Sequence, residues 1–276
     1  MNSLKTMDRV EKAQCDAVEG EQMQSVNVLG VDIHCVDMRG VLDTVRGYIA
    51  TGQPHMIVTA DSYSVVLAHS APEFREIVNG ADLVTPDGSG ILLGARLLGT
   101  PLSERVSGCD IAQELCRTAG EESFSVFFLG AKPGIAQAAA ENMQKKCPGL
   151  AVAGVHDGYF GPEKDSEIAA LVRESGASVL LVAMGIPRQE KFIRDHLHKF
   201  GVSVAMGVGG SFDVFSGKVK RAPMWMRRRG LEWAYRLAKD PSKISKVAVL
   251  PKFLWLVLKD KWFGKDRSGE KKGCSK

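Results

Sequence analysis

Short apolar runs alternate with longer amphipathic segments from residue 25 to about residue 215. The runs are rich in Val, Ile, Leu and Phe and end at Gly, Pro or polar residues, which is typical of buried strands. We therefore predict strands at 26–29, 31–36, 55–59, 82–85, 125–129, 151–155, 178–183 and 202–206.

Helical periodicity lies between these runs, and helices are predicted near 39–50, 62–79, 89–98, 109–119, 133–146, 163–175 and 188–199. Strand and helix in turn indicate an α/β fold with a mostly parallel, Rossmann-like sheet that helices flank on both faces. The first two strands are joined through Gly30 and are expected to form a small hairpin instead.

The strand pattern stops at Gly217, and 221–239 is predicted to be a helix with Pro223 in its first turn and Pro241 beyond its end. We therefore divide the chain into a polar, disordered leader at 1–24, an α/β core at 25–216 and a basic, Trp-rich helical appendage at 217–276. The longest apolar run, 247–258, contains Pro251 and Lys252 and is too short for the roughly 20 residues of a membrane span.

Charge is divided unevenly between these parts. Residues 217–276 hold 18 of the 36 Lys and Arg residues but five of the 32 Asp and Glu residues, a formal charge of +13, against −9 for residues 1–216. All four tryptophans also lie there, at Trp225, Trp233, Trp255 and Trp262.

Basic charge with Trp on helix-forming sequence favours an anionic membrane surface over two alternatives, a solvated tail and a nucleic-acid patch. The apolar run 253–258 is the deciding feature, because nucleic-acid binding leaves it unexplained. We expect an appendage that lies on the membrane without crossing it, and no nucleic-acid partner.

The composition fits one α/β domain plus an appendage, with 276 residues, 45% hydrophobic and 25% charged. The amino-terminal segment, with Lys5, Asp8 and Glu11, lacks the apolar stretch of a secretory signal. Six cysteines occur without a C-x-x-C pair, so we expect reduced thiols and a cytoplasmic location rather than a zinc site or disulfide framework.

In parallel sheets, ligands bind beyond the carboxyl ends of the strands, so the residues there are the candidates for chemistry. Asp87 follows the predicted strand 82–85 within the run PDGSG at 86–90. It is either a helix cap or turn residue, or a general base that accepts the proton of an attacking hydroxyl.

Thr59 and Asp61 end the predicted strand 55–59 in the same way and would point to one side of an extended segment. Capping of the next helix is the equally good alternative for Asp61.

Two further strand ends carry glycine turns before a helix, at Gly185 and at Gly130. Such a turn permits close backbone approach, and the helix terminus favours an anion. Gln189 lies in the first turn after Gly185, where an amide can donate and accept. Neither turn has the Gly-Lys-Ser/Thr of a P-loop, so ATPase or GTPase chemistry is not expected.

The run MGVGGSFD at 206–213 lacks the G-x-G-x-x-G spacing of a dinucleotide-binding turn. Asp213 remains a candidate for binding a ribose hydroxyl, while glycines such as Gly209 either serve that site or only let the strand turn sharply.

The pattern of potential ligands predicts neither a metal site nor a cofactor. His196 and His198 are two residues apart on a predicted helix and so face different ways. No strand end carries the D-x-D of metal-dependent sugar-nucleotide transferases. If the substrate is a sugar nucleotide, arginines, lysines and helix termini must neutralise its diphosphate.

Taken together, the motifs resemble the WecG/TagA/CpsF family of bacterial glycosyltransferases over about residues 26–241. The resemblance rests on their order and spacing: Pro86-Asp87-Gly88-x-Gly90, Glu104-Arg105-Val106-x-Gly108-x-Asp110, Gly185-x-Pro187-x-Gln189-Glu190-Lys191, Gly207-Val208-Gly209-Gly210-x-Phe212-Asp213, Gly217-x-Val219-x-Arg221-Ala222-Pro223 and Leu231-Glu232-Trp233-x-Tyr235-Arg236-Leu237.

The resemblance implies an inverting, metal-independent enzyme at the inner face of the cytoplasmic membrane. Such enzymes move an N-acetylmannosamine-type sugar from UDP to undecaprenyl-diphosphate-linked N-acetylglucosamine, for teichoic acid or other surface polysaccharides. Self-association is left open. Another UDP-hexose or UDP-uronic acid donor, an NAD-linked oxidoreductase and a membrane-tethered nucleotide-binding protein are the alternatives.

The resemblance also assigns roles to residues. It makes Asp87 the base, places Thr59 and Gln189 at the sugar, and gives Arg105 to the acceptor or diphosphate. Substrate contacts are further expected from Asp61, Gly130, Tyr159, Gly185, Gly209, Asp213, Arg221 and Arg236, with Tyr159 and Asp213 at the nucleotide and Arg236 closing over the diphosphate.

Two positions depart from the family pattern. Asp61 stands where the family usually has Asn, which adds negative charge near the donor. Lys243 and Lys246 replace arginines after Asp240-Pro241, and lysine keeps the charge but not the bidentate fork.

Overall fold

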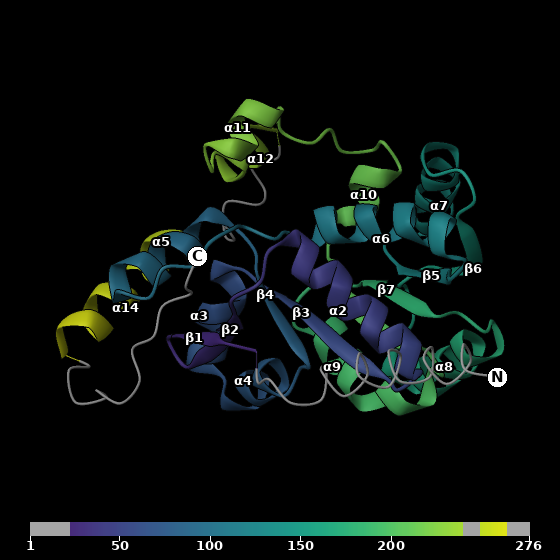
Figure 1. Ribbon diagram of the computed structural model, residues 1–276, viewed down its shortest axis with the longest axis horizontal. Helices are drawn as coiled ribbons and strands as arrows, with labels where there is room; N and C mark the ends of the chain where they lie inside the picture. Colours follow the sequence, from purple (N-terminus) through teal and green to yellow (C-terminus); the bar gives the residue numbers. More distant parts are fainter. Residues whose placement is uncertain (1–22, 240–248, 264–276) are drawn as a thin grey trace, which may run out of the picture.

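A computed structural model describes residues 23–239 and 249–263. Its centre is a six-stranded sheet in which every neighbouring pair is parallel (Figure 1). The predicted mixed α/β fold with a parallel sheet is therefore confirmed. The strand order is β4 (Leu83–Pro86), β3 (His55–Ala60), β8 (Val204–Gly207), β7 (Val179–Ala183), β5 (Ser125–Gly130) and β6 (Ala151–His156).

Helices cover both faces of the sheet because alternate strand residues enter two separate apolar clusters. Val58 belongs to one cluster and its neighbour Ile57 to the other. The first face packs against α3 (Ser62–Ser70), α4 (Pro72–Asn79), α5 (Ser89–Leu98), α8 (Asp165–Glu174) and α9 (Arg188–His196). The second packs against α2 (Met38–Thr51), α6 (Gly108–Glu122), α7 (Ile135–Lys146) and α10 (Ser211–Phe215).

The expected hairpin is present as β1 (Ser25–Val28) and β2 (Val31–His34), which pair antiparallel. Gly30 has φ 91° in the turn, a region that glycine adopts without strain. The hairpin is tied to the sheet through His34, whose Nδ1 accepts the Val84 N–H at 2.9 Å. Burial lowers the pKa of His34, which keeps the ring neutral for this acceptor role.

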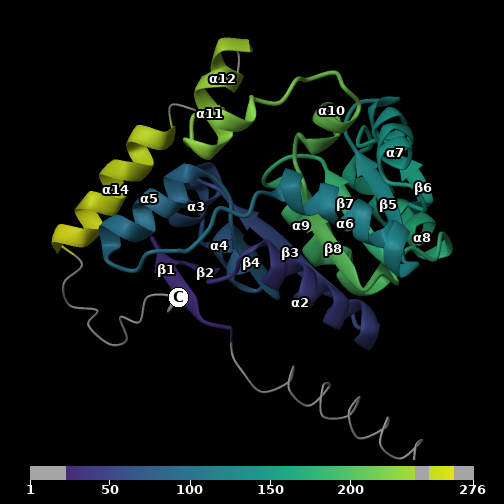
Figure 2. The same cartoon turned by 45° about the horizontal axis from the view of Figure 1, so that its top comes forward.

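Two long predicted helices are each broken into two. The segment 62–79 divides into α3 and α4 because Pro72 lacks the N–H that a continuous helix needs, and Ala71 before it is extended. The segment 221–239 divides into α11 (Met224–Arg228) and α12 (Glu232–Lys239) around Gly230, whose φ is 71°. Figure 2 shows both short helices above the edge of the sheet.

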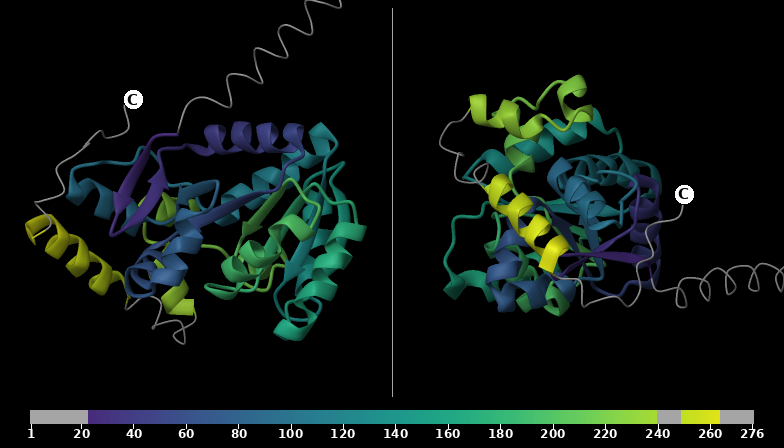
Figure 3. Two further views of the ribbon diagram at one scale, coloured as in Figure 1. Left: turned by 90° about the horizontal axis from the view of Figure 1, so that it is seen from below. Right: turned by 90° about the vertical axis from the view of Figure 1, so that its left-hand side faces the viewer.

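Part of the apolar run that was expected to face the membrane is buried in the core of the protein. Within α14 (Val249–Phe263), Phe253, Leu256 and Val257 are buried against α5 and α3. A Cβ on Gly94 of α5 would lie 2.6 Å from the Phe253 ring, so this glycine allows the close packing. The prediction that the whole run faces lipid is therefore wrong. Its outer side does expose Trp255, and α14 lies on the outside of the molecule in Figure 3.

None of the helices in the described ranges combines the length and apolar character that a bilayer crossing requires. The predicted leader at 1–24 lies almost wholly outside the described residues, as do Lys243 and Lys246. The division of the chain at residue 216 stays a prediction.

Cys109, Cys116 and Cys147 are free and buried as expected, whereas Cys35 is disulfide-bonded, contrary to the expectation of reduced thiols.

Candidate active site

The carboxyl ends of β3 and β4 bring two of the predicted catalytic residues to the first turn of α6. The strands pair in register, with Thr59 opposite Thr85. The Gly108 N–H at the start of α6 donates to Asp87 Oδ2 at 3.1 Å. A Cβ on Gly108 would lie 3.0 Å from Thr59 Oγ1, so Thr59 is in close contact with the same turn. Asp87, Thr59 and the amino terminus of α6 therefore form one corner.

Local sequence explains why Asp87 faces α6. Its own N–H continues the sheet by donating to the Ala60 carbonyl at 2.9 Å, and the next residue, Gly88, has φ 92°. The chain thus turns away at Gly88 while the Asp87 carboxylate stays at the strand end. A helix amino terminus stabilises negative charge, which favours the ionised form of this carboxylate. The arrangement suits a carboxylate that accepts a proton from a bound hydroxyl.

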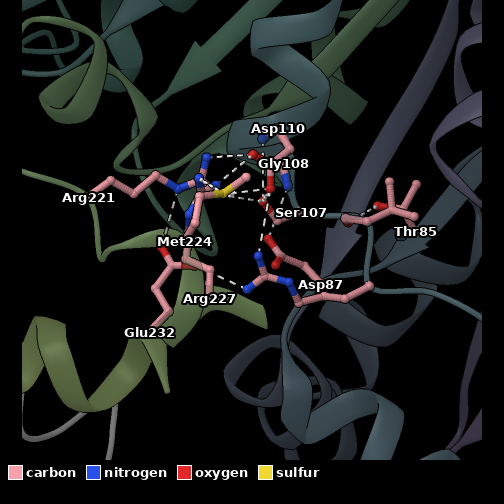
Figure 4. A network of polar contacts seen from close by, with 11 residues as sticks. Thr85, Asp87, Ser107, Gly108, Asp110, Arg221, Met224, Arg227 and Glu232 are labelled. Carbon is pink, nitrogen blue, oxygen red and sulfur yellow. Dashed lines mark hydrogen bonds and ion pairs between the residues drawn. The ribbon is translucent and has the colours of Figure 1, made fainter. Parts of the chain in front are cut away.

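Beside this corner lies a set of charged residues that we call the arginine–carboxylate network: Arg105, Asp110, Arg221, Arg227 and Glu232. Arg221 Nη2 donates to Asp110 Oδ2 at 2.8 Å, and Arg105 Nη1 donates to Glu232 Oε2 at 3.1 Å. Arg227 Nη1 donates to Asp110 Oδ1 at 3.4 Å. Figure 4 shows the side chains of Asp110, Arg221, Arg227 and Glu232 grouped near the first turn of α6.

The electrostatics of the network favour its charged form. Burial opposes ionisation of Asp110, but hydrogen bonds from Arg221 and Ser107 and the charge of Arg105 hold the pKa of Asp110 below its usual value. Burial likewise opposes the charge of Arg221, yet its bond to Asp110 raises the pKa of that arginine. Three arginines against two carboxylates leave net positive charge close to Asp87.

The network also holds the appendage against the core. Arg221 precedes α11 and Glu232 begins α12, whereas their partners Asp110 and Arg105 belong to α6 and the loop before it. The junction of α11 and α12 makes a further contact, since Ser89 Oγ donates to the Gly230 carbonyl at 3.1 Å. Ser89 is two residues beyond Asp87, so the appendage lies next to the candidate base.

A cleft of about 760 Å³ opens on the other side of the network. Asp110, Arg221 and Arg227 line it together with Lys146 and Lys220. Sequence reasoning missed Lys146, Arg227 and the two carboxylates as site residues, although Asp110 and Glu232 stand inside the quoted motifs. The cleft provides a basic surface that is contiguous with the Asp87 corner through the shared arginines.

Gln189 is buried. The side chain is 3% exposed, and its Oε1 accepts the N–H groups of Gly185 at 3.0 Å and Gly209 at 3.1 Å. The structure therefore shows Gln189 bound to backbone groups, which brings Gly185 and Gly209 together. The contact of Gln189 with the sugar stays a prediction. Asp61 is the amino-terminal cap of α3, with its side chain accepting the Ser64 N–H, so the capping alternative is confirmed.

The remaining predicted residues lie at other strand ends. Gly130 packs so tightly on Ala183 that a Cβ would meet its carbonyl oxygen at 2.5 Å. Tyr159 is 65% exposed in the loop after β6, whose Gly158 N–H donates to Ala131 beside Gly130. Asp213 is on α10 and forms an ion pair with Lys218 at 3.8 Å. The side chain of Arg236 lies outside the described residues.

Within the described ranges, no group of three His, Cys, Asp or Glu residues has the arrangement of a metal site. The dependence of the reaction on metal stays a prediction. The geometry nonetheless offers positive charge from side chains and from the α6 terminus, which can neutralise a diphosphate.

Known proteins resemble this chain over most of its length. The model of the family described as "Glycosyl transferase WecG/TagA/CpsF family" matches residues 26–267. A relative from Bacillus spizizenii, named N-acetylglucosaminyldiphosphoundecaprenol N-acetyl-beta-D-mannosaminyltransferase, is 36% identical over 239 residues, 86% of this chain and 91% of the relative.

Two other relatives carry the same name. The Bacillus subtilis protein is 35% identical over 188 residues, 68% of this chain and 73% of the relative. The Staphylococcus aureus protein is 31% identical over 245 residues, 88% of this chain and 96% of the relative. The family match runs from the first strand through α14, so it includes both the Asp87 corner and the appendage.

Proposed function

This chain belongs to the WecG/TagA/CpsF glycosyl transferase family, and on that premise we propose that it moves an N-acetylmannosamine-type sugar from UDP to undecaprenyl-diphosphate-linked N-acetylglucosamine. The names of the three relatives describe N-acetyl-β-D-mannosaminyl transfer to this acceptor. The observation that carries the proposal is the Asp87 carboxylate at the amino terminus of α6, with Thr59 and the arginine–carboxylate network beside it.

In the proposed reaction, Asp87 takes the proton from the acceptor hydroxyl. The oxygen attacks the anomeric carbon, and UDP leaves from the opposite face, so the configuration inverts. Thr59 contacts the same turn of α6 as Asp87 and is placed to hydrogen-bond the reacting sugar. One displacement requires one base, and Asp87 is proposed for it because Asp110, in the same helix turn, is paired with arginines.

Negative charge that develops on UDP is stabilised by side chains in this scheme, and no metal takes part. Arg105, Arg221 and Arg227 are the proposed cations, and each also pairs with a carboxylate of the network. Fixed donors of this kind stabilise a leaving diphosphate without reorganisation. Arg236 is proposed to join them when the appendage closes over the diphosphate.

The appendage is proposed to lie on the inner face of the cytoplasmic membrane, where a polyprenyl acceptor is found. Its outer surface exposes Trp225, Trp233, Trp255, Trp262 and Phe263. Lys259 lies over the Trp255 ring at 5.3 Å, which brings a cation and an interfacial aromatic together. Such a pairing of a basic and an aromatic side chain suits anionic headgroups.

The experiment that tests the function is release of UDP from a panel of UDP-sugars, with and without a short-chain lipid-diphosphate N-acetylglucosamine. We expect UDP-N-acetylmannosamine to react and only when the acceptor is present. A different sugar as the best donor would change the substrate and keep the reaction class. No UDP release from any donor would refute the proposed function, and reduction of NAD by the protein would favour an oxidoreductase.

A further inference from the structure

Glu190 is a buried acid that the proposed reaction does not use. The residue is 3% exposed on α9, next to Gln189, which is equally buried. Its Oε1 accepts the Gln189 Nε2–H at 2.7 Å. Its Oε2 is buried without a hydrogen-bond partner among the described residues. An acid in such a place costs stability, so a purely packing role would be better served by an apolar side chain.

The partner of Glu190 joins two loops at the carboxyl edge of the sheet. Gln189 Oε1 accepts one N–H from Gly185, after β7, and one from Gly209, after β8. Both glycines have positive φ, 78° and 51°, so neither loop has the regular backbone that would fix it by a strand ladder. One carbonyl oxygen therefore sets the spacing of two loops that are separate in sequence.

Glu190 and the two backbone N–H groups select the same orientation of the Gln189 amide. With the amide reversed, Nε2 would face the two backbone N–H groups and Oε1 would face the Glu190 carboxyl oxygen, so all three hydrogen bonds would be lost. The site leaves little room for another arrangement, because a Cβ on Gly207 would lie 2.5 Å from Gln189 Nε2. An acceptor at position 190 thus completes the set of bonds that hold the amide in the observed orientation.

We propose that Glu190 is a positioning residue that acts through Gln189 to fix the Gly185 and Gly209 loops for binding of the sugar-nucleotide donor. This inference rests on the proposed function and on the sequence-based expectation that Gly185 and Gly209 contact the substrate. We call the three residues Gln189, Gly185 and Gly209, with Glu190 behind them, the loop clamp.

The loop clamp needs an acceptor at position 190 and does not need a negative charge. Burial, and to a smaller extent the charge of Asp61, raise the pKa of Glu190 to about 7. When the acid is neutral, the proton is accommodated on Oε2 and the carbonyl oxygen Oε1 still accepts from Gln189. A glutamine at position 190 offers the same acceptor, whereas methionine fills the space and offers none.

The test compares Glu190→Gln, Glu190→Met, Gln189→Met and the double variant Q189M/E190M. The matched control is Glu141→Met, because Gln137 Nε2 donates to Glu141 Oε1 at 2.9 Å on the exposed side of α7. Donor KM and kcat are measured with saturating acceptor. Hydrogen exchange at the Gly185 and Gly209 amides is measured without substrate, and thermal unfolding shows that each variant folds.

We expect E190M to raise donor KM about tenfold, the effect of one buried hydrogen bond, with a smaller change in kcat. Exchange at the Gly185 and Gly209 amides should rise, and the double variant should be no worse than Q189M alone, because Glu190 acts through Gln189. E190Q should keep donor KM within about threefold of wild type, because the glutamine oxygen still accepts the hydrogen bond from Gln189. E141M should change neither readout.

Additive effects of Q189M and E190M would overturn the proposal, as would an E190M variant with wild-type donor KM or an E190Q variant as impaired as E190M. Glu190→Ala replaces E190M if the methionine variant does not fold. A wild-type protein that releases no UDP would refute the proposed function instead. The exchange of the two glycine amides would then still decide whether Glu190 fixes the loops.

Discussion

At the scale of single residues, Asp87 carries the heaviest assignment, and Asp87→Asn tests it. The substitution removes the base but keeps an oxygen that accepts the Gly108 N–H, so the fold and UDP affinity should be retained. The turnover rate should fall by about 10²–10⁴, the usual contribution of a general base. The control is Asp37→Asn, since Asp37 also accepts a backbone N–H at a helix start, that of α2, and belongs neither to the corner nor to the network. Near wild-type turnover in the Asp87 variant would reject the base.

Glu190 gives the fold a pH dependence of known sign. Burial raises the pKa of this acid from 4.5 to about 7 in the fold. The folded state therefore favours the protonated form, so the contribution to stability is complete below pH 4.5 and is lost as pH rises through about 7.

The measurement is urea unfolding of the wild type and Glu190→Gln at pH 5 and pH 8. The glutamine does not titrate, whereas the wild type loses stability as the pH rises. From pH 5 to pH 8 the free energy of unfolding of the variant should therefore increase by roughly 2–3 kcal/mol relative to that of the wild type. A difference between the two proteins that stays constant with pH would show that Glu190 ionises normally.

The residue scale is also where sequence reasoning was weakest. Strand ends and motifs predicted that Thr59, Asp87 and Arg105 lie at the carboxyl edge of the sheet. The structure brings these three residues near the first turn of α6. The burial of Gln189 was not foreseeable, because it depends on Gly209, which is 20 positions away and meets it only through strand order. Pairings such as Arg105 with Glu232, 127 positions apart, have no local signal.

At the scale of elements, apolar runs predicted the sheet well because buried parallel strands leave continuous apolar sequence. Every predicted strand in the sheet is present. Breaks inside helices were missed at Pro72 and Gly230, although both residues are known helix breakers. The apolar run of α14 was assigned to lipid because sequence periodicity does not tell which surface an apolar face covers. In the structure, Gly94 on α5 leaves room for the Phe253 ring of this run.

The contact between α12 and the core predicts the effect of Glu232→Gln. Glu232 is 7% exposed and lies between Arg105 and Arg221. Neutralising it removes one of the two carboxylates that balance these poorly solvated arginines and leaves Asp110 to pair with both. We expect a loss of roughly 3 kcal/mol in the free energy of unfolding, as for other broken buried ion pairs. Chemical denaturation measures it.

The matched control is Glu121→Gln, which breaks the Arg117 ion pair on the surface of α6, where the two side chains are 48% and 59% exposed. An exposed pair contributes at most about 1 kcal/mol, so this variant should stay close to wild type. Equal effects of the two substitutions would mean that the arginine–carboxylate network does not hold α12 to the core.

At the scale of the whole molecule, the uneven charge and the exposed tryptophans predict membrane association through the appendage. Because α14 also supplies core residues, the sharp test is substitution of its outer side rather than truncation. Trp255→Ser with Trp262→Ser removes side chains that are 59% and 68% exposed, so folding should be unaffected. Sedimentation with anionic liposomes should fall strongly.

Wild-type binding should weaken in high salt without vanishing, since each basic residue contributes about 1 kcal/mol that salt screens while the aromatic contribution is not screened. Leu171→Ser is the control, as Leu171 is 40% exposed on α8, outside the appendage. A double tryptophan variant that sediments like wild type would place the membrane contact elsewhere.

The central claim is inverting transfer of an N-acetylmannosamine-type sugar to a lipid-linked acceptor with side chains in place of a metal. The most direct measurement is nuclear magnetic resonance of the disaccharide formed from UDP-N-acetylmannosamine and a short-chain lipid-diphosphate N-acetylglucosamine in the presence of EDTA. The account predicts a β-linked product at an undiminished rate, and none with Asp87→Asn. An α-linked product, or a rate that collapses with EDTA and returns with Mg²⁺ or Mn²⁺, would contradict it.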